Sequence, residues 1–428
     1  MLKNLRAWWT LDTAAEQDSP DNPFGPLAPH QRRDAGPMLA LAFGWGFLIT
    51  GLFIGGLLGA GQPFWPELAW SSLLGNGVNF VVGALVGYMG YRTGMNSGLL
   101  FRLVYGNVGA AVPVLFLAVL LVLWQGITVG AFSFAWVQDF SSPWFKVIAI
   151  FAGLLYTGTT YYGVKGLEKV ALPAALILVA VLIYAGWYNI DRAGGWTAFL
   201  ELSRATAAKA PLGNVQAMNI VIGSWIVGAV VMAEYTRFAR QAWVAIAIPF
   251  IVLVVTQWIL QFVGAMGGVV SGNFDFTVYM RSIGTLVSLF GLVAMSFALW
   301  TTGDANLYLP SIQTASVFRR PKRVMVVICG LLGTVIGLGI YQRFMDFINV
   351  LAYLAPPLIG PVIVDYYVCN GMTFRAELLE RLLAWNPVAV VAFAAGAAGS
   401  WFAPAWLANG LFGLLVSMAV YWVVYQAA

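Results

Sequence analysis

Long apolar stretches separated by short polar connections follow one another along almost the whole chain. A helix crosses a bilayer in about 20 apolar residues. Twelve stretches fit this length, roughly 38–61, 70–91, 108–137, 144–163, 170–190, 213–236, 242–270, 284–312, 323–342, 346–369, 386–403 and 407–426. The pattern predicts an all-α polytopic membrane protein with twelve transmembrane helices.

The composition supports this interpretation and excludes a soluble protein. Of the 428 residues, 61% are hydrophobic and 9% are charged, against about 25% charged in a soluble domain. A soluble fold of this length cannot bury so much apolar surface. Without a large polar domain or a P-loop in the sequence, we do not expect a pump driven by ATP.

The distribution of Lys and Arg predicts the orientation, because cytoplasmic loops carry an excess of both. With the N-terminus inside, 16 of the 22 lie on the cytoplasmic side. We therefore expect a multi-pass protein of the plasma (inner) membrane with both termini in the cytoplasm. The net charge of +5 fits these basic loops, so we expect no binding of nucleic acid.

Glycines cluster in the first and sixth apolar stretches. The first contains seven, including Gly44 and Gly46, and the sixth contains Gly223-Ser224 and Gly228. Close helix packing through small residues is one explanation. Interrupted helices at corresponding places in two halves, a feature of secondary transporters, are the other. The two stretches begin successive five-helix units, so we favour interrupted helices.

The expected domains follow from this arrangement. They are a cytoplasmic tail (1–37), a first five-helix repeat (38–190), a second five-helix repeat (191–369) and two additional C-terminal helices (370–428).

A few polar residues lie inside the apolar stretches, where they are costly and usually functional. Asp304 is the deepest acidic residue. The pairs Trp124-Gln125 and Ser224-Trp225 each place an indole beside a hydrogen-bonding group. Two such pairs on different helices suit a flat polar heterocycle stacked between indoles.

Five phrases resemble, in order, the nucleobase:cation symporter-1 family, and bacterial cytosine permeases most closely. They are PLAPHQRR (26–33), GYRTGMNSGLLFRLVYGNVGAAVP (90–113), GSWIVGAVVMAEYTRFAR (223–240), LWTTGDANLY (299–308) and LAPPLIGPVIVDYY (354–367). The resemblance implies a core of two inverted five-helix repeats with discontinuous helices 1 and 6, followed by two extra helices. It also implies uptake by alternating access, coupled to sodium or protons.

In sodium-coupled members of that family the ion lies between the break in span one and span eight. The resemblance assigns the two span-eight hydroxyls to Thr301 and Thr302 and the carbonyl to Ala298. It places the span-one carbonyls near Gly44 and Leu48. The alternative is that both threonines bond back to carbonyls one turn earlier. We favour sodium as the coupling ion and expect no other cofactor.

The same resemblance places the ring of Trp225 against the substrate, with Ser224 before it. Trp124, Gln125, and groups around Gly303 and Asp304 are the other candidates for substrate binding. Two features depart from cytosine permeases. Gly303 stands where cytosine permeases have an Asn directly after the two threonines. Those permeases also separate the Gln and the Trp of span three by about one helical turn, whereas Trp124 and Gln125 are adjacent, so that their side chains point about 100° apart on a helix.

Cytosine or a close relative is therefore the expected substrate. The nearest alternative is a proton-coupled transporter of another flat heterocycle, such as another purine or pyrimidine, a hydantoin or allantoin, with Asp304 as proton carrier. Asp304 follows Thr301 by three residues and shares a helix face with it, so a direct ligand or an outer-shell partner of the ion is another interpretation. The last is the cap of a helix break after Gly303.

Other classes of protein fit less well. A channel would need a filter or voltage sensor, a receptor would need an output domain, and an enzyme would need a catalytic motif. We expect no catalytic residue and no obligate protein partner.

Overall fold

The described part of the chain is helical. The computed structural model describes residues 9–10, 24–162, 164–281, 285–374 and 376–427. Within these residues the only β-type pairing is a parallel bridge between Arg33 and Ala239. The all-α prediction is confirmed.

The helices of the first half account for the first five apolar stretches. They are α3 (Ala35–Gly46), α4 (Thr50–Gly61), α5 (Ala69–Thr93), α6 (Ser97–Tyr105), α7 (Ala111–Val137), α8 (Pro143–Tyr161) and α9 (Val164–Arg192), with η1 (Pro29–Gln31) and η2 (Phe64–Leu68). The short α6 lies in the connection before α7 and is capped by Asn96, whose side chain accepts from the amide of Leu99 at 2.8 Å.

The second half contains the remaining helices. They are α10 (Trp196–Ala207), α11 (Asn214–Val230), α12 (Ala233–Thr236), α13 (Ala242–Phe250), η3 (Ile251–Thr256), α14 (Gln257–Ser271), α15 (Phe276–Arg281), α16 (Thr285–Phe318), α17 (Lys322–Gly337), η4 (Ile340–Arg343), α18 (Phe344–Val364), η5 (Asp365–Cys369), η6 (Ala376–Glu380), α19 (Pro387–Trp401) and α20 (Asn409–Ala427).

Every one of the twelve apolar stretches contains one helix or two or three consecutive helices. By length and hydropathy alone, six helices in the described residues can cross a membrane, or up to eight if each of two bent pairs counts as one span. The count of twelve, the inverted repeat and the four expected domains stay predictions.

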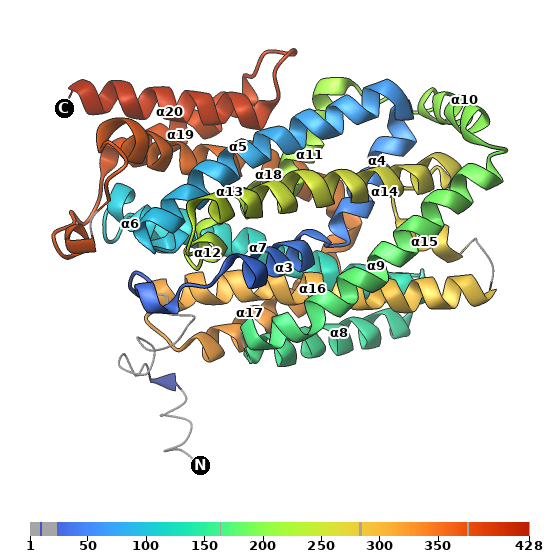
Figure 1. The fold of residues 1–428 in the computed structure, drawn as a ribbon, viewed down its shortest axis with the longest axis horizontal. Coiled ribbons are helices and arrows are strands. Elements are labelled where there is room, and N and C mark those ends of the chain that lie inside the picture. The colour runs from blue at the N-terminus through green and yellow to red at the C-terminus, as the bar shows by residue number, and fades with distance from the viewer. Residues whose placement is uncertain (1–8, 11–23, 163, 282–284, 375, 428) are drawn as a thin grey trace.

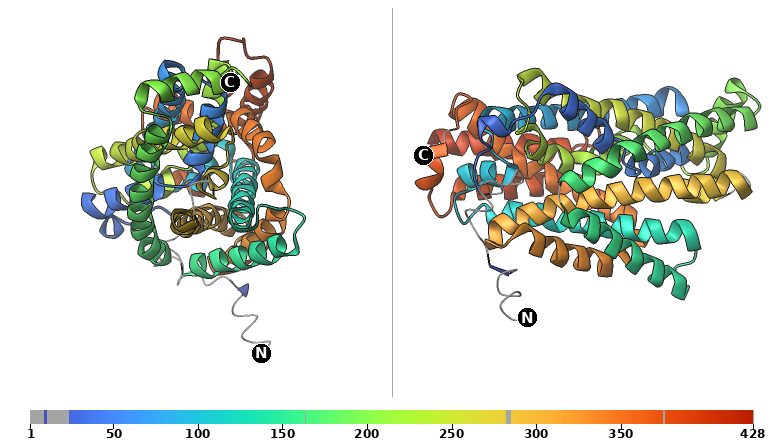
Figure 2. Two further views of the ribbon diagram at one scale, coloured as in Figure 1. Left: turned by 90° about the vertical axis from the view of Figure 1, so that its right-hand side faces the viewer. Right: turned by 60° about the horizontal axis from the view of Figure 1, so that its bottom comes forward.

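The helices form two packed groups (Figures 1 and 2). In the first group α4 packs on α14 and α5 packs on α11 and α13. In the second, α7 packs on α16 and α17, and α8 packs on α17. The C-terminal α19 and α20 pack on each other and on α18.

Both expected helix interruptions are present. The axes of α3 and α4 differ by 46° across the three residues between Gly46 and Thr50. The sixth stretch is interrupted between Val230 and Ala233. This second break comes after Gly228, whereas Gly223 and Ser224 lie inside α11.

Close backbone contact explains several of the remaining glycines in the first stretch. A Cβ on Gly55 or Gly59 of α4 would meet the backbone of α14 at Gln261 or Ala265. A Cβ on Gly264 of α14 would in turn meet the backbone of Leu52. The two helices therefore touch backbone to backbone.

Candidate functional site

The break between α3 and α4 is stabilised by bonds that replace helical ones. The amide of Leu48 donates to the carbonyl of Gly46 at 2.9 Å, and not to that of Gly44. The same Gly46 carbonyl accepts from Nε2 of Gln257 at 2.7 Å. The amide of Ile49 donates to Oγ1 of Thr302 on α16 at 3.3 Å. The break is therefore bonded to α14 through the Gly46 carbonyl and to α16 through the Ile49 amide.

The two threonines of α16 lie at this break, as the resemblance implied. Their hydroxyls both donate to the carbonyl of Ala298, at 3.0 Å from Thr301 and 2.7 Å from Thr302. The bond back to a carbonyl one turn earlier is thus present. It uses only the hydroxyl proton, so the oxygen lone pairs stay free to accept. For Thr302, one lone pair is already used by the Ile49 amide.

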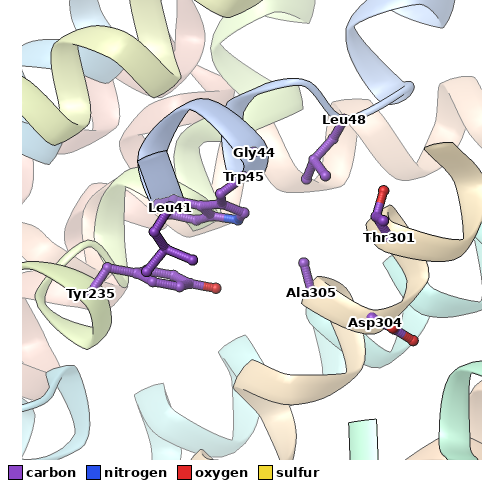
Figure 3. A pocket seen from close by; sticks show the side chains of 8 residues that line it. All are labelled: Leu41, Gly44, Trp45, Leu48, Tyr235, Thr301, Asp304 and Ala305. Carbon is purple, nitrogen blue, oxygen red and sulfur yellow. The ribbon is translucent and has the colours of Figure 1, made fainter. Parts of the chain in front are cut away.

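A small cavity, of about 30 Å³, connects the break to α16 (Figure 3). Its lining contains three of the five predicted sodium ligands, and the complete set is Leu41, Gly44, Trp45, Leu48, Tyr235, Thr301, Asp304 and Ala305. Ala298 and Thr302 lie one turn or less from it on the same helix, and both are buried. The structure therefore brings together the residues predicted for sodium.

Asp304 lines the same cavity, but its side chain is directed toward α8. Its Oδ1 accepts from the hydroxyl of Thr159 at 2.6 Å and from that of Thr160 at 3.4 Å. Thr159 in turn accepts from the indole N–H of Trp300 at 3.1 Å. Oδ2 is buried and has no hydrogen-bond partner among the described residues. This is a carboxylate surrounded by neutral groups, without a salt bridge within the described residues.

The proposed cap on a helix break is wrong for Asp304. Helix α16 runs without interruption from Thr285 to Phe318, straight through Gly303 and Asp304. A residue in the middle of a helix has no unpaired amides to cap.

A second cavity, of about 30 Å³, lies beside the first and shares Trp45 and Leu48 with it. It contains three of the residues predicted for the substrate, and its lining is Trp45, Leu48, Thr50, Leu121, Trp124, Ser224, Trp225, Val227, Gly228, Asn306 and Leu309. Below, this space is called the central cavity. It has aromatic walls and a few polar groups, as ligand sites commonly do.

Three aromatic rings meet between the two cavities. The ring of Trp45 stacks on Tyr235 with centroids 3.9 Å apart. The same ring meets Trp225 edge to face at 5.5 Å. The indole N–H of Trp225 is buried and has no partner among the described residues, so it is available to a ligand. Figure 3 shows Trp45 and Tyr235 on one side of the cavity and Thr301 on the other.

Two predicted substrate residues lie elsewhere. A Cβ on Gly333 would meet the side-chain oxygen of Gln125, so Gln125 faces α17. A Cβ on Gly303 would meet the ring of Tyr156, so Gly303 faces α8. Neither lines the central cavity. For Gln125 the reason is the angle of about 100° between neighbours on a helix, since Trp124 takes the inward position.

Several residues at the site were not predicted from the sequence. They are Trp45, Thr50, Thr159, Thr160, Tyr235 and Asn306. Trp45 could have been predicted as a site residue, because it stands between Gly44 and Gly46 at the expected break. Asn306 lines the central cavity and lies four residues beyond Thr302, one turn along the same helix. An amide therefore does reach the central cavity, from one turn further along α16.

Comparisons with known proteins identify the family of this chain. Residues 28–425 match the family described as permeases for cytosine/purines, uracil, thiamine and allantoin. The cytosine permease of Escherichia coli (strain K12) is 28% identical over 386 residues, which is 90% of each chain. The hydantoin permease of Microbacterium maritypicum is 21% identical over 90% of this chain and 84% of its own.

Solved structures show the same fold. Mhp1, a nucleobase-cation-symport-1 family transporter with bromovinylhydantoin bound, superposes with a TM-score of 0.81 at 17% identity and 94% coverage of both chains. A sodium-coupled sialic acid symporter gives 0.67 at 11% identity, covering 93% of this chain and 90% of its own. The resemblance in the sequence is thereby confirmed. The chain is a multi-pass membrane protein and belongs to the permease family for cytosine/purines, uracil, thiamine and allantoin.

Proposed function

We propose that this permease imports cytosine or a close relative across the plasma membrane by alternating access, coupled to sodium. The observation that carries the proposal is the arrangement at the α3–α4 break. Backbone released by the break lies against two adjacent hydroxyls of α16, and an aromatic cavity adjoins it through Trp45 and Leu48.

In this proposal sodium binds between the break and α16. The ligands are the carbonyls of Gly44, Leu48 and Ala298 and the hydroxyls of Thr301 and Thr302. Such oxygens are what a hard cation prefers, and in the interior of a membrane protein they come from a helix break and from hydroxyls. The carboxyl group of Asp304, buried beside the same cavity, supplies further oxygens close to the ion.

The substrate ring binds in the central cavity. Trp225 and Trp124 offer stacking surfaces, and Ser224 and Asn306 offer hydrogen bonds to the ring edge. The hydroxyl of Ser224 donates to the carbonyl of Val221 at 2.7 Å, so its oxygen can accept from an amino group or ring N–H. Gln125 and Gly303 have no role in this arrangement.

Sodium and substrate bind to neighbouring parts of the same break. A ligand shifts a conformational equilibrium only if it binds one state better than another. Sodium, which draws the break against α16, favours the arrangement that completes the walls of the central cavity. Each ligand then raises the affinity for the other, by the reciprocity of linked binding.

A thermal-shift screen of the purified protein tests the proposal. Cytosine, uracil, adenine, hypoxanthine, hydantoin and allantoin are added with sodium or with choline in its place. We expect cytosine to raise the melting temperature in sodium and much less in choline, since a ligand stabilises by RT ln(1 + [L]/Kd). Stabilisation by cytosine that is equal in both salts but changes with pH would instead indicate coupling to protons. No stabilisation by any of the six compounds would refute the substrate class.

A further inference from the structure

A third and larger cavity, of about 390 Å³, lies apart from the site described above. We call it the vestibule. It is formed by the end of α7, the loop before α8, the connection from α14 to α15, and η4 with the first turn of α18. Helix α15 lies at the right-hand end of the molecule in Figure 1, opposite the C-terminus. In the proposed orientation this end faces the outside, from which an imported substrate arrives.

Two stacked pairs of aromatic rings line the vestibule. The rings of Phe134 and Phe140 are 4.4 Å apart and inclined by 14°. The rings of Phe274 and Phe344 are 5.8 Å apart and inclined by 6°. Tyr341 lies between the pairs, 5.9 Å from Phe134 and 6.4 Å from Phe274. Flat rings favour offset-stacked and edge-to-face partners, so a planar ligand finds both kinds of surface here.

The ring of Tyr341 is held in place by a hydrogen bond of its hydroxyl group. The hydroxyl of Tyr341 donates to Oδ2 of Asp275 at 2.7 Å. Oδ1 of Asp275 accepts from the amide and the hydroxyl of Thr277, at 2.8 and 2.6 Å. Asp275 is only 2% exposed, so its carboxylate serves these internal bonds and fixes the orientation of the Tyr341 ring.

The open side of the vestibule is polar. Asn273 and Gln342 line it with side-chain amides. Arg343 and Asp346 form an ion pair at 3.6 Å, with side chains 78% and 72% exposed. These groups can satisfy the donors and acceptors on the edge of a heterocycle, while the phenyl rings cover its faces. An ion pair this exposed contributes little stability of its own.

Phe344 lines the vestibule and packs against a residue that lines the central cavity. Its ring lies 6.1 Å from that of Trp124, and Trp124 lines the central cavity. Phe347, one turn further along α18, is 5.2 Å from Trp124 on the same side. The contacting rings of Phe344 and Trp124 therefore lie between the two spaces.

We propose that the vestibule is a second, outer binding site for a flat aromatic heterocycle, occupied before the ring passes Phe344 into the central cavity. The inference rests on the proposed function for the class of ligand. Stacking gives the outer site its affinity, and the exposed polar rim lets the ligand enter and leave without a large rearrangement.

Protection of an engineered thiol tests the proposal, with cytosine as the probe. Exposed Gln342 is replaced by Cys in protein carrying Cys369→Ser, and Cys329 is kept because it is 3% exposed. Protein without Gln342→Cys gives the background labelling. We expect cytosine to slow labelling of Gln342→Cys by a methanethiosulfonate reagent, and to do so equally when Trp225→Leu disables the central cavity.

Substitutions in the vestibule and on the lipid face sharpen the test. Phe140→Ala should raise the half-protecting cytosine concentration about tenfold, because it removes a stacking partner. Phe140→Tyr keeps the ring and should keep the protection. Phe151→Ala on α8, where the side chain is 58% exposed, makes the same substitution outside the vestibule and should change nothing.

Three results would overturn the outer site. They are no protection by cytosine, protection that disappears with Trp225→Leu, and protection unaffected by Phe140→Ala. The proposed function fails in a different way, when stabilisation by cytosine is the same in sodium and in choline and is unchanged by Trp225→Leu. Protection of Gln342→Cys that persists in Trp225→Leu still supports the vestibule in that case.

Discussion

The hydroxyl of Thr302 is the direct polar contact between the helix break and α16. It donates to Ala298 and accepts from the amide of Ile49. A hydroxyl has one proton and two lone pairs, so one lone pair remains for an ion. Thr301, one residue earlier, makes only the bond to Ala298 among those recorded for its side chain. The two threonines should therefore differ in what their loss costs the protein.

Substitution of each threonine by Ala should abolish most of the sodium dependence of uptake, raising the half-saturating sodium concentration about tenfold or more. Only Thr302→Ala should also destabilise the protein, by about 1–3 kcal/mol, because it leaves the buried amide of Ile49 without a partner. Sodium titrations of uptake and melting temperatures separate the two effects. Thr302→Ser, which keeps the hydroxyl, is the control, and undiminished sodium dependence in Thr302→Ala would contradict the assignment of the ion site.

The amide of Asn306 should select the substrate. Asn306→Leu, similar in size, should weaken cytosine binding about tenfold to a hundredfold, because a buried polar edge of the ring loses its partner. Binding of labelled cytosine in sodium measures this. Asn306→Gln keeps an amide and should lose less. An unchanged affinity in Asn306→Leu would mean that the cytosine edge is recognised by other groups.

Single residues were predictable from the sequence only where a motif fixed their neighbours. Thr301, Thr302 and Trp225 stand in collinear phrases, and the structure places them at the break and the central cavity. The contact between Trp45 and Tyr235 joins residues 190 positions apart on different helices, which no local pattern encodes. Gln125 was misplaced because hydropathy alone does not show which face of an apolar helix meets the cavity.

At the scale of elements, the interruptions were predictable and their positions were less so. Glycine is unfavourable in a helix by about 1 kcal/mol relative to Ala, which made the first stretch recognisable. The sixth stretch breaks at Val231–Met232 and not at its glycines. There, Gly223 faces the backbone of Ile348 on α18. Gly223 therefore serves close helix packing. The number of glycines in a stretch does not show whether they serve packing or a helix break.

The contact between α4 and α14 should be sensitive to a single methyl group. Gly55→Ala places a Cβ against the carbonyl of Gln261, and overpacking of this kind costs about 1–3 kcal/mol. We expect a lower melting temperature. Gly158→Ala on α8 makes the same change where nothing lies within 4 Å, and it should keep or raise the melting temperature because Ala is the better helix former. Equal melting temperatures for the two variants would contradict the close contact.

On the scale of the whole molecule, the charge asymmetry predicts which end faces the cytoplasm. Exposed Ser141 lies between α7 and α8, and exposed Gln241 lies between α12 and α13. In cells expressing Ser141→Cys on a Cys369→Ser background, a membrane-impermeant maleimide should label the protein from outside. Gln241→Cys should react only after permeabilisation. The reverse pattern would invert the orientation and place the vestibule in the cytoplasm.

The N-terminal segment was predicted to be a tail, yet part of it is bound to the helices. The amide of Arg33 donates to the carbonyl of Phe238 at 2.7 Å, and the amide of Arg240 donates back to Arg33 at 3.1 Å. Asp34 adds an ion pair with Arg240 at 2.6 Å. Such pairing between distant parts of the chain uses backbone groups, so side-chain patterns gave no sign of it.

The bend between α3 and α4 allows α3 to rotate as a rigid unit about the break. Since α4 is in backbone contact with α14, the three residues between Gly46 and Thr50 are the place where rotation is easiest. Helix α3 has 12 residues and is therefore about 18 Å long. A rotation of about 10° at its inner end would displace its far end by about 3 Å, roughly the diameter of a water molecule. A small rotation of α3 at the ion site would thus open a path at the membrane surface.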